Sequence, residues 1–306
     1  MKKHFPGYYN YTDEALADIW KTGIFVFDTS VLLNIYYLSS QKQTFLGILD
    51  KLKKRIKLPY HIAEEYHKNI FQKIKEQYQH FNDIKNKAHQ LRTCIQNSSK
   101  HALWDSKEKE DIIAQIALID DKIDAIQNNN LYAELRSRIA NLFASALCEQ
   151  LSSQEIEEIE KEAKERFETC SAPGYKDKKK TNGNMYGDFI IWKSLQKISK
   201  EKKAPLIFVI EDSKADWFFS INSTLYARPD WLNEFILETE QDLLIYTSSQ
   251  FIDGYSKYIK TPKAKNLAEL KSEIKDVQAM RQNDSESTNN NQINNVDSTE
   301  SSDSEK

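Results

Sequence analysis

Carboxylates follow two apolar segments of this 306-residue chain, at positions where α/β proteins commonly place their chemistry. The segment FVFD ends in Asp28, and the segment FVIED ends in Glu211 and Asp212. Both segments are typical of buried parallel strands, and ligands gather at the carboxyl ends of such strands. A single acid after a strand also serves as a helix cap or a turn residue, so this alternative stays open for each acid.

Further acids stand where predicted helices begin. Glu64 and Glu65 open a predicted helix after Pro59, and Asp188 follows Gly187 at the start of another. The helix dipole and helix capping also favour acids at such positions. As a set, acids at strand ends and helix starts are expected to converge, and converging carboxylates repel one another unless cations neutralise them. Hard carboxylate oxygens select Mg²⁺ or Mn²⁺ rather than zinc.

Other catalytic patterns are missing from the sequence. The six histidines form no HExxH or HxH pattern, which argues against a zinc site. No GxxxxGK[ST] loop and no GxSxG elbow supports NTP hydrolysis or serine hydrolase chemistry. Cys94, Cys148 and Cys170 are widely spaced and odd in number, which argues against a disulfide framework and a zinc ribbon. A reducing cytoplasm fits this cysteine usage.

Alternating strands and helices are predicted to position the acids. Predicted strands span residues 23–28, 55–59, 205–212 and 242–247. Predicted helices span residues 41–55, 188–199, 228–238 and 248–259, the last with a serine cap. This alternation predicts an α/β fold around a central parallel sheet.

The middle and the end of the chain differ from this pattern. A segment almost without Gly or Pro, rich in Lys, Glu, Gln and Ala, predicts a large α-helical insertion at about residues 70–170. The loop SAPGYKDKKKTNGNMYGD follows, and such loops are exposed and often functional. The sequence therefore predicts one domain over residues 1–270 and a disordered acidic polar tail over residues 271–306.

Charge and hydropathy limit the partners. The net charge is −3, and the tail holds eight acids against four bases, which leaves residues 1–270 close to neutral. A nucleic-acid partner would therefore have to meet local basic clusters at residues 51–55, 176–180 or 200–203, each of which is also explained as a solvated surface. No stretch approaches the roughly 18 apolar residues of a membrane span. We expect a cytoplasmic protein without a membrane partner.

Five motifs carry a resemblance to PIN-like domains. They are FDTSVLLN at 27–34, PYHIAEEYHKN at 59–69, PGYKDKKK at 173–180, YGDFIIW at 186–192 and FVIEDSKADWF at 208–218. In order and spacing they resemble the bacterial subgroup with a long helical insertion between the second and third acids, over residues 20–262. The resemblance implies a Rossmann-like PIN fold and an acidic metal site that hydrolyses phosphodiester bonds.

The resemblance also implies roles for individual acids. It assigns catalytic and metal-ligand positions to Asp28, Glu65 of the P-x5-E motif, Asp188 of the GD motif and Asp212 after the fourth strand. Asp216 in KADW is an optional fifth ligand, and Glu211 stays open as the working ligand in place of Asp212.

Residues beside these acids are candidates for substrate binding. Lys178, Lys179 and Lys214 would hold substrate phosphates, although surface lysines also serve solubility alone. Thr29 or Ser30 would donate a hydrogen bond to a phosphate or orient the first carboxylate.

Trp192 and Trp217 are candidates for base stacking, but an aromatic residue beside an apolar strand or on a helical face more often belongs to the core.

The function implied is that of an endonuclease dependent on Mg²⁺ or Mn²⁺, with RNA favoured over DNA as its substrate. A role in phage defence or as a toxin-like effector follows by analogy alone. One alternative is a catalytically silent module that binds nucleic acid or protein on a PIN-like scaffold. Another is a homo-oligomer or a protein complex formed through the polar helical insertion. The acidic tail is also a candidate for blocking the substrate cleft.

Overall fold

The chain divides into two compact units. The computed structural model describes residues 1–97, 105–171, 173–176, 185–211, 216–222, 224–259 and 265–280. One unit comprises Met1–Tyr66 with Leu142–Lys306, and the other comprises His67–Asn141.

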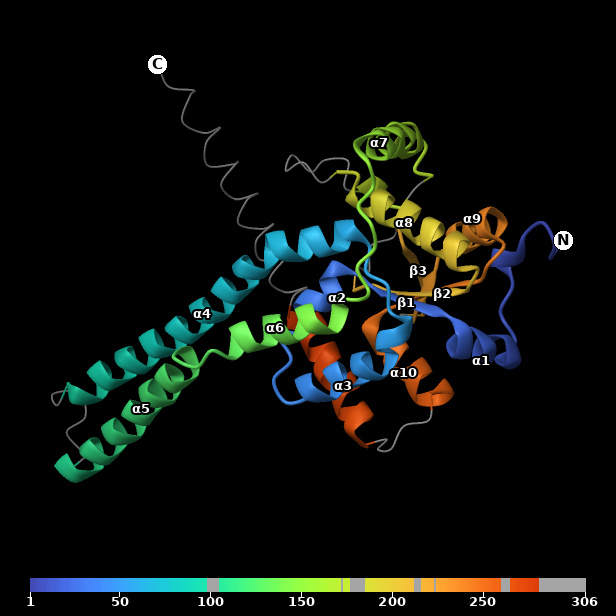
Figure 1. Cartoon of the computed structure of the whole chain (residues 1–306). Helices are drawn as coiled ribbons and strands as arrows, with labels where there is room; N and C mark the ends of the chain where they lie inside the picture. Colours follow the sequence, from blue (N-terminus) through green and yellow to red (C-terminus); the bar gives the residue numbers. More distant parts are fainter. Residues whose placement is uncertain are drawn as a thin grey trace, which may run out of the picture. The chain divides into compact units, whose positions relative to one another are not determined.

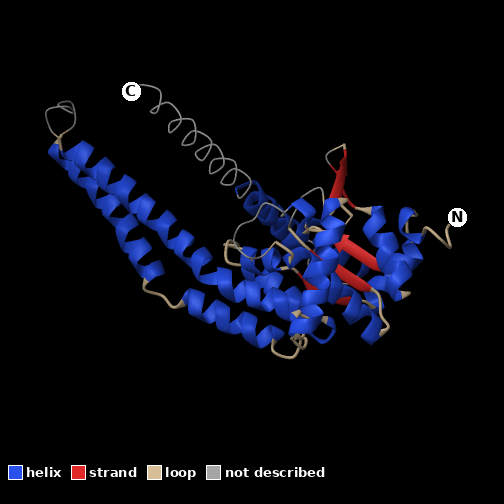
Figure 2. Cartoon of the chain, turned by 90° about the horizontal axis from the view of Figure 1, so that it is seen from above, coloured by secondary structure: helices blue, strands red, loops and turns tan. Residues whose placement is uncertain are grey.

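A parallel sheet forms the centre of the first unit. It consists of β1 (Ile24–Phe27), β2 (Leu206–Val209) and β5 (Leu243–Tyr246), in the order β1-β2-β5. Figure 1 labels β1 and β2, and Figure 2 shows the strands in red among the helices. Ile24 pairs with Leu206, and Leu206 pairs with Leu243. The predicted strand at 55–59 is reduced to isolated bridges, from Ile56 to Phe25 and from Leu58 to Leu147. The α/β fold with a central parallel sheet is thus confirmed.

Helices cover both faces of this sheet. The first unit contains α1 (Asp13–Thr22), α2 (Thr29–Asn34), α3 (Lys42–Leu52), α7 (Ser153–Glu168), α8 (Gly187–Lys202), α9 (Pro229–Thr239) and α10 (Ser248–Tyr258). Helices α8 and α9 lie on one face, and α1 and α10 lie on the other (Figure 1). Trp20 of α1 stacks on Phe251 of α10 at 5.6 Å, and Trp192 of α8 packs on Phe235 of α9 at 5.7 Å. Burial on both faces explains why the strands are continuous apolar runs.

The helices of the predicted insertion are divided between the two units. Helix α4 (Tyr60–Gln96) begins in the first unit and continues into the second, which also contains α5 (Ser106–Gln127) and most of α6 (Leu131–Phe143). The second unit ends at Asn141, and α7 belongs to the first unit, where it packs against α8. Among the helices described, none is long and apolar enough to cross a membrane.

Two elements of the structure are not predicted from the sequence. A hairpin of β3 (Phe218–Ile221) and β4 (Thr224–Ala227) follows the acids after β2. A C-terminal helix covers residues 265–280, so residues 271–280 are helical and do not belong to a disordered tail. Its apolar side chains recur at helical intervals and are buried, a pattern that the polar composition of the segment conceals: they are Leu267, Leu270, Ile274 and Val277. The remaining tail residues, 281–306, lie outside the described part of the chain.

Candidate metal and active site

Asp28 lies at the carboxyl end of β1 and caps helix α2. Its Oδ2 accepts hydrogen bonds from the backbone N–H of Ser30 at 2.9 Å and from Ser30 Oγ at 2.5 Å. Asp28 is therefore a helix cap, and the Ser30 hydroxyl orients its carboxylate. The side chain is only 7% exposed, which leaves its charge poorly solvated.

Glu65 of α4 is the acid that the fold brings next to Asp28. Thr29 Oγ1 donates a hydrogen bond to Glu65 Oε2 at 2.7 Å. Burial, and then the negative charge of Glu65, raise the pKa of Asp28 to about 6. Helix α4 begins at Tyr60 and has no acid in its first turn, so the helix dipole does not account for Glu65.

Glu211 at the end of β2 is tied to the same edge of the sheet by its backbone. Its N–H donates to Ser30 Oγ at 3.1 Å, so one hydroxyl bridges the ends of β1 and β2. Its carboxylate, however, accepts a hydrogen bond from Gln278 Nε2 of the C-terminal helix. Sequence reasoning missed Gln278, which stands in a polar segment without a distinguishing motif. Asp212, the alternative fourth ligand, lies outside the described residues.

Asp188 and Asp216 both lie against Gly174, which precedes them in the sequence. Asp188 lies in the first turn of α8 and accepts a hydrogen bond from Trp217 Nε1 at 3.4 Å. Asp216 is fully buried, and its Oδ2 accepts from the backbone N–H of Gly174 at 3.1 Å. Gly174 has a φ of +85°, and a Cβ there would lie 2.8 Å from the Cβ of Asp188. Only glycine fits at this position. The Pro-Gly pair at residues 173–174 is the sequence feature that indicates a turn here.

The two tryptophans of the predicted motifs belong to the core. Trp192 and Trp217 are both fully buried and pack edge to face at 6.1 Å. Neither offers a face to a nucleic-acid base. The predicted phosphate-binding lysines, Lys178, Lys179 and Lys214, lie outside the described residues.

The donor chemistry of the Asp28 and Glu65 pair fits a divalent cation. A cation between the carboxylates would offset the burial and repulsion that raise the pKa of Asp28. Within the described ranges, no three His, Cys, Asp or Glu side chains gather as a group that could hold a metal. The structure thus brings Asp28 and Glu65 together and leaves Asp188 in contact with Trp217, while the complete four-acid set stays a prediction.

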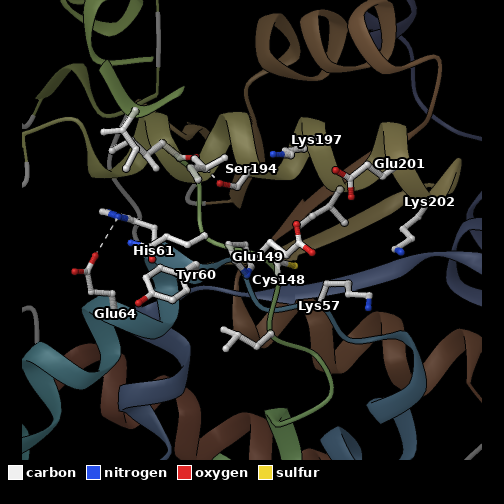
Figure 3. A pocket seen from close by; sticks show the side chains of 17 residues that line it. Lys57, Tyr60, His61, Glu64, Cys148, Glu149, Ser194, Lys197, Glu201 and Lys202 are labelled. Atoms are coloured by element: carbon white, nitrogen blue, oxygen red, sulfur yellow. Dashed lines mark hydrogen bonds and ion pairs between the residues drawn. The ribbon is translucent and has the colours of Figure 1, made fainter. Parts of the chain in front are cut away.

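A separate cavity of about 300 Å³ lies beside the first turn of α4 (Figure 3). Lys57, Cys148 and Lys202 line it, together with His61, whose Nδ1 lies 3.9 Å from Glu64 Oε2. Burial is the largest effect on the Cys148 thiol and raises its pKa, which keeps the thiol neutral and poorly nucleophilic. Glu64 lines this cavity, but Asp28, Glu65, Asp188, Glu211 and Asp216 do not, so the cavity is distinct from the candidate active site.

Comparison with known proteins places the chain in a family. No curated protein and no solved structure matches it. The family model for PIN-like domains matches residues 24–232, from β1 into α9. The matched range is more than half of the chain and contains the acids described above, Asp28, Glu65, Asp188, Glu211 and Asp216. The chain therefore belongs to the PIN-like domain family.

Proposed function

We propose that the chain is a metal-dependent endonuclease that hydrolyses phosphodiester bonds. PIN-like domains are generally nucleases, which makes nucleic acid the expected substrate. The observation that carries the proposal is the pairing of Asp28 with Glu65 at the carboxyl edge of the sheet. Two neighbouring acids, one of them buried with a raised pKa, lower the stability of the fold when both are ionised. Such a pair is suited to binding a cation, which would neutralise the charges.

Each residue of the candidate site has a defined task in this proposal. Asp28 and Glu65 would hold Mg²⁺ or Mn²⁺, with Asp188 and Asp212 as the predicted further ligands. A bound cation supplies Lewis-acid chemistry by activating water and neutralising charge on phosphate oxygens. Ser30 and Thr29 fix the two carboxylates through hydrogen bonds, which limits the reorganisation needed for binding.

Basic side chains beside the acid motifs complete the proposed substrate site. Lys214 stands two residues after Asp212, and Lys178 and Lys179 belong to the PGYKDKKK motif that precedes Asp188 in the sequence. These three lysines would hold substrate phosphates.

RNA is the proposed substrate, because many PIN-like proteins cleave RNA. A role in phage defence or as a toxin-like effector is proposed by analogy. Growth arrest on expression of the wild type, relieved by Asp28→Asn, would support such a role.

Cleavage of labelled nucleic acids tests the proposed activity. Single-stranded RNA, structured RNA, single-stranded DNA and duplex DNA would each be incubated with Mg²⁺, Mn²⁺ or EDTA. We expect metal-dependent cutting of RNA by the wild type, and its loss in Asp28→Asn and Asp188→Asn. Asp18→Asn, which removes an exposed acid of α1, is the matched control and should cut normally. Cutting that persists in EDTA would refute the proposal.

A silent binding module is the second candidate. It is favoured by the lack of a group of three metal-ligating side chains within the described residues. In the same assay this candidate predicts no cutting of any substrate, together with tight binding that EDTA does not change.

A further inference from the structure

A second cavity lies at the edge of the sheet formed by β5. It has a volume of about 500 Å³, is open to solvent, and is lined within the first unit by residues of the N-terminal segment, the β3–β4 hairpin, α9 and β5. Six aromatic side chains line it: Tyr8, Tyr9, Tyr11, Phe219, Tyr226 and Tyr246. The cavity is therefore unusually rich in flat apolar surfaces.

The lining carries no charged side chain among the described residues, and its polar groups are amides and phenols. Asn10 and Gln250 supply the amides, and Gln250 Nε2 already donates to the carbonyl of Leu225 at 2.7 Å. Burial, and then the charge of Asp242, raise the pKa of Tyr11, so its hydroxyl stays neutral, and this hydroxyl already donates to the carbonyl of Leu243 at 3.5 Å. A neutral, flat ligand with hydrogen-bonding edges suits these groups, whereas a charged headgroup would lose its hydration without compensation.

Two of the lining rings lie on the hairpin and are partly exposed. Phe219 and Tyr226 are direct cross-strand partners, and their rings stack at 5.6 Å with an interplanar angle of 25°. Phe219 is 38% exposed and Tyr226 is 47% exposed, and Tyr8 and Tyr9 are also exposed. Exposed aromatic side chains gathered around one cavity mark a binding surface more often than scattered ones do.

The position of the cavity links it to the candidate active site. The hairpin begins two residues after Asp216, and β5 is the direct neighbour of β2, whose end carries Glu211. Neighbouring strands lie about 4.8 Å apart, so β5 is about two strand spacings from β1. The Lys2 ammonium lies 5.3 Å from the centre of the Tyr9 ring, which places a positive charge at the rim.

We propose that this aromatic cavity binds a base of a single-stranded nucleic acid and thereby holds the strand that the acids cleave. This inference rests on the proposed nuclease function, since the strand must run from the cavity to Asp28 and Glu65. Stacking on aromatic rings is tolerant of base identity, because every base presents a flat face. The site therefore selects single strands over duplexes without reading sequence.

Binding to short labelled single strands of RNA and DNA tests the proposal by fluorescence anisotropy. The experiment uses the full chain with Asp28→Asn, so that cutting does not interfere. Replacing both Phe219 and Tyr226 by Ala should weaken binding roughly 5- to 100-fold. Tyr226→Phe keeps the ring and should bind normally. Ile221→Ala is the matched control, because Ile221 is an exposed apolar residue of the same hairpin outside the cavity lining.

An abasic strand with the same backbone separates stacking from charge. It should bind weakly to both proteins and show no difference between them. Equal affinity of the parent and the double Ala variant for the normal strand would overturn the proposal. Failure of the parent to bind any single strand would also overturn it, and so would binding of a proline-rich peptide in place of the strand. Equal unfolding midpoints of both proteins would exclude misfolding as the cause of a loss.

A cleavage assay without the Asp28→Asn substitution separates the base-binding proposal from the nuclease proposal. If the double Ala variant cuts with an unchanged KM, only the base-binding role of the cavity is refuted. Ring-dependent binding without any cutting would instead refute the nuclease and leave the base-binding cavity standing.

Discussion

The hydroxyl of Thr29 donates a hydrogen bond to Oε2 of Glu65 at 2.7 Å, and so joins the end of β1 to helix α4. Thr29 is 4% exposed, which shields this bond from water. The residue directly after the first acid of the site thus orients the second acid. Such supporting bonds hold ligands in the geometry that a metal requires.

Removal of the Thr29 hydroxyl should weaken metal use. Thr29→Val keeps the shape of the side chain but leaves Glu65 without this donor, so we expect a loss of roughly 10- to 100-fold in metal affinity or activity. The measurement is the cleavage rate as a function of Mg²⁺ or Mn²⁺ concentration. Thr29→Ser retains the hydroxyl and serves as the control. A Thr29→Val protein with the wild-type metal dependence would contradict the assigned role.

Asp28→Asn should stabilise the metal-free protein while abolishing cleavage. The pKa of Asp28 is raised from 3.8 to about 6 in the folded chain, so ionisation of Asp28 costs folding free energy. The cost is absent below the unfolded value, grows as pH rises between the two values, and is complete above the folded value. At about pH 7 in EDTA, we expect the variant to be more stable by up to about 3 kcal/mol.

Urea unfolding at several pH values checks this expectation. The difference should vanish below the unfolded pKa, and Mg²⁺ or Mn²⁺ should stabilise the wild type but not Asp28→Asn. A variant less stable than the wild type in EDTA would show that the Asp28 carboxylate is not destabilising.

The contact between Glu211 and Gln278 predicts which acid after β2 serves as a ligand. Because the Glu211 carboxylate accepts a hydrogen bond from the C-terminal helix, we expect Glu211→Gln to retain most of the cleavage activity. Asp212→Asn should abolish it. Cleavage rates of the two variants at saturating metal show which of the two acids is the ligand. The reverse order of effects would make Glu211 the ligand.

Glu273 should anchor the C-terminal helix. Partial burial opposes its ionisation, but hydrogen bonds from Ser39, Ser40 and Gln41 outweigh this effect and lower its pKa to about 2. The stabilisation is present above the ordinary value of 4.5 and is lost as pH falls towards 2. Glu273→Gln should therefore cost about 1–2 kcal/mol near neutral pH, less than the pKa shift alone implies because the site is partly solvated.

Chemical denaturation of Glu273→Gln beside Asp276→Asn tests this anchor. Asp276 is an exposed acid of the same helix, and its substitution should leave stability unchanged. The effect of Glu273→Gln should shrink in acid. Equal stability of the two variants at neutral pH would contradict the anchoring role.

The sequence by itself determined the strands of the sheet and the location of the acids along them. β1, β2 and β5 lie inside the predicted ranges, because continuous apolar runs between polar turns are stable only when buried on both faces. Asp28 and Glu211 consequently stand at the carboxyl ends of neighbouring strands. The motifs also sufficed to indicate the PIN-like family, which the matching family model confirms.

Only the tertiary structure decided which side chains meet. Three contacts join residues that are separated in the sequence. They are the hydrogen bond from Thr29 to Glu65, the close approach of Gly174 to Asp188, and the hydrogen bond from Gln278 to Glu211. Local patterns encode burial, capping and turns, but they carry no information about which distant surface covers a given face. For the same reason, composition assigned residues 271–280 to a polar tail, although four apolar side chains of the helix 265–280 are buried against the domain.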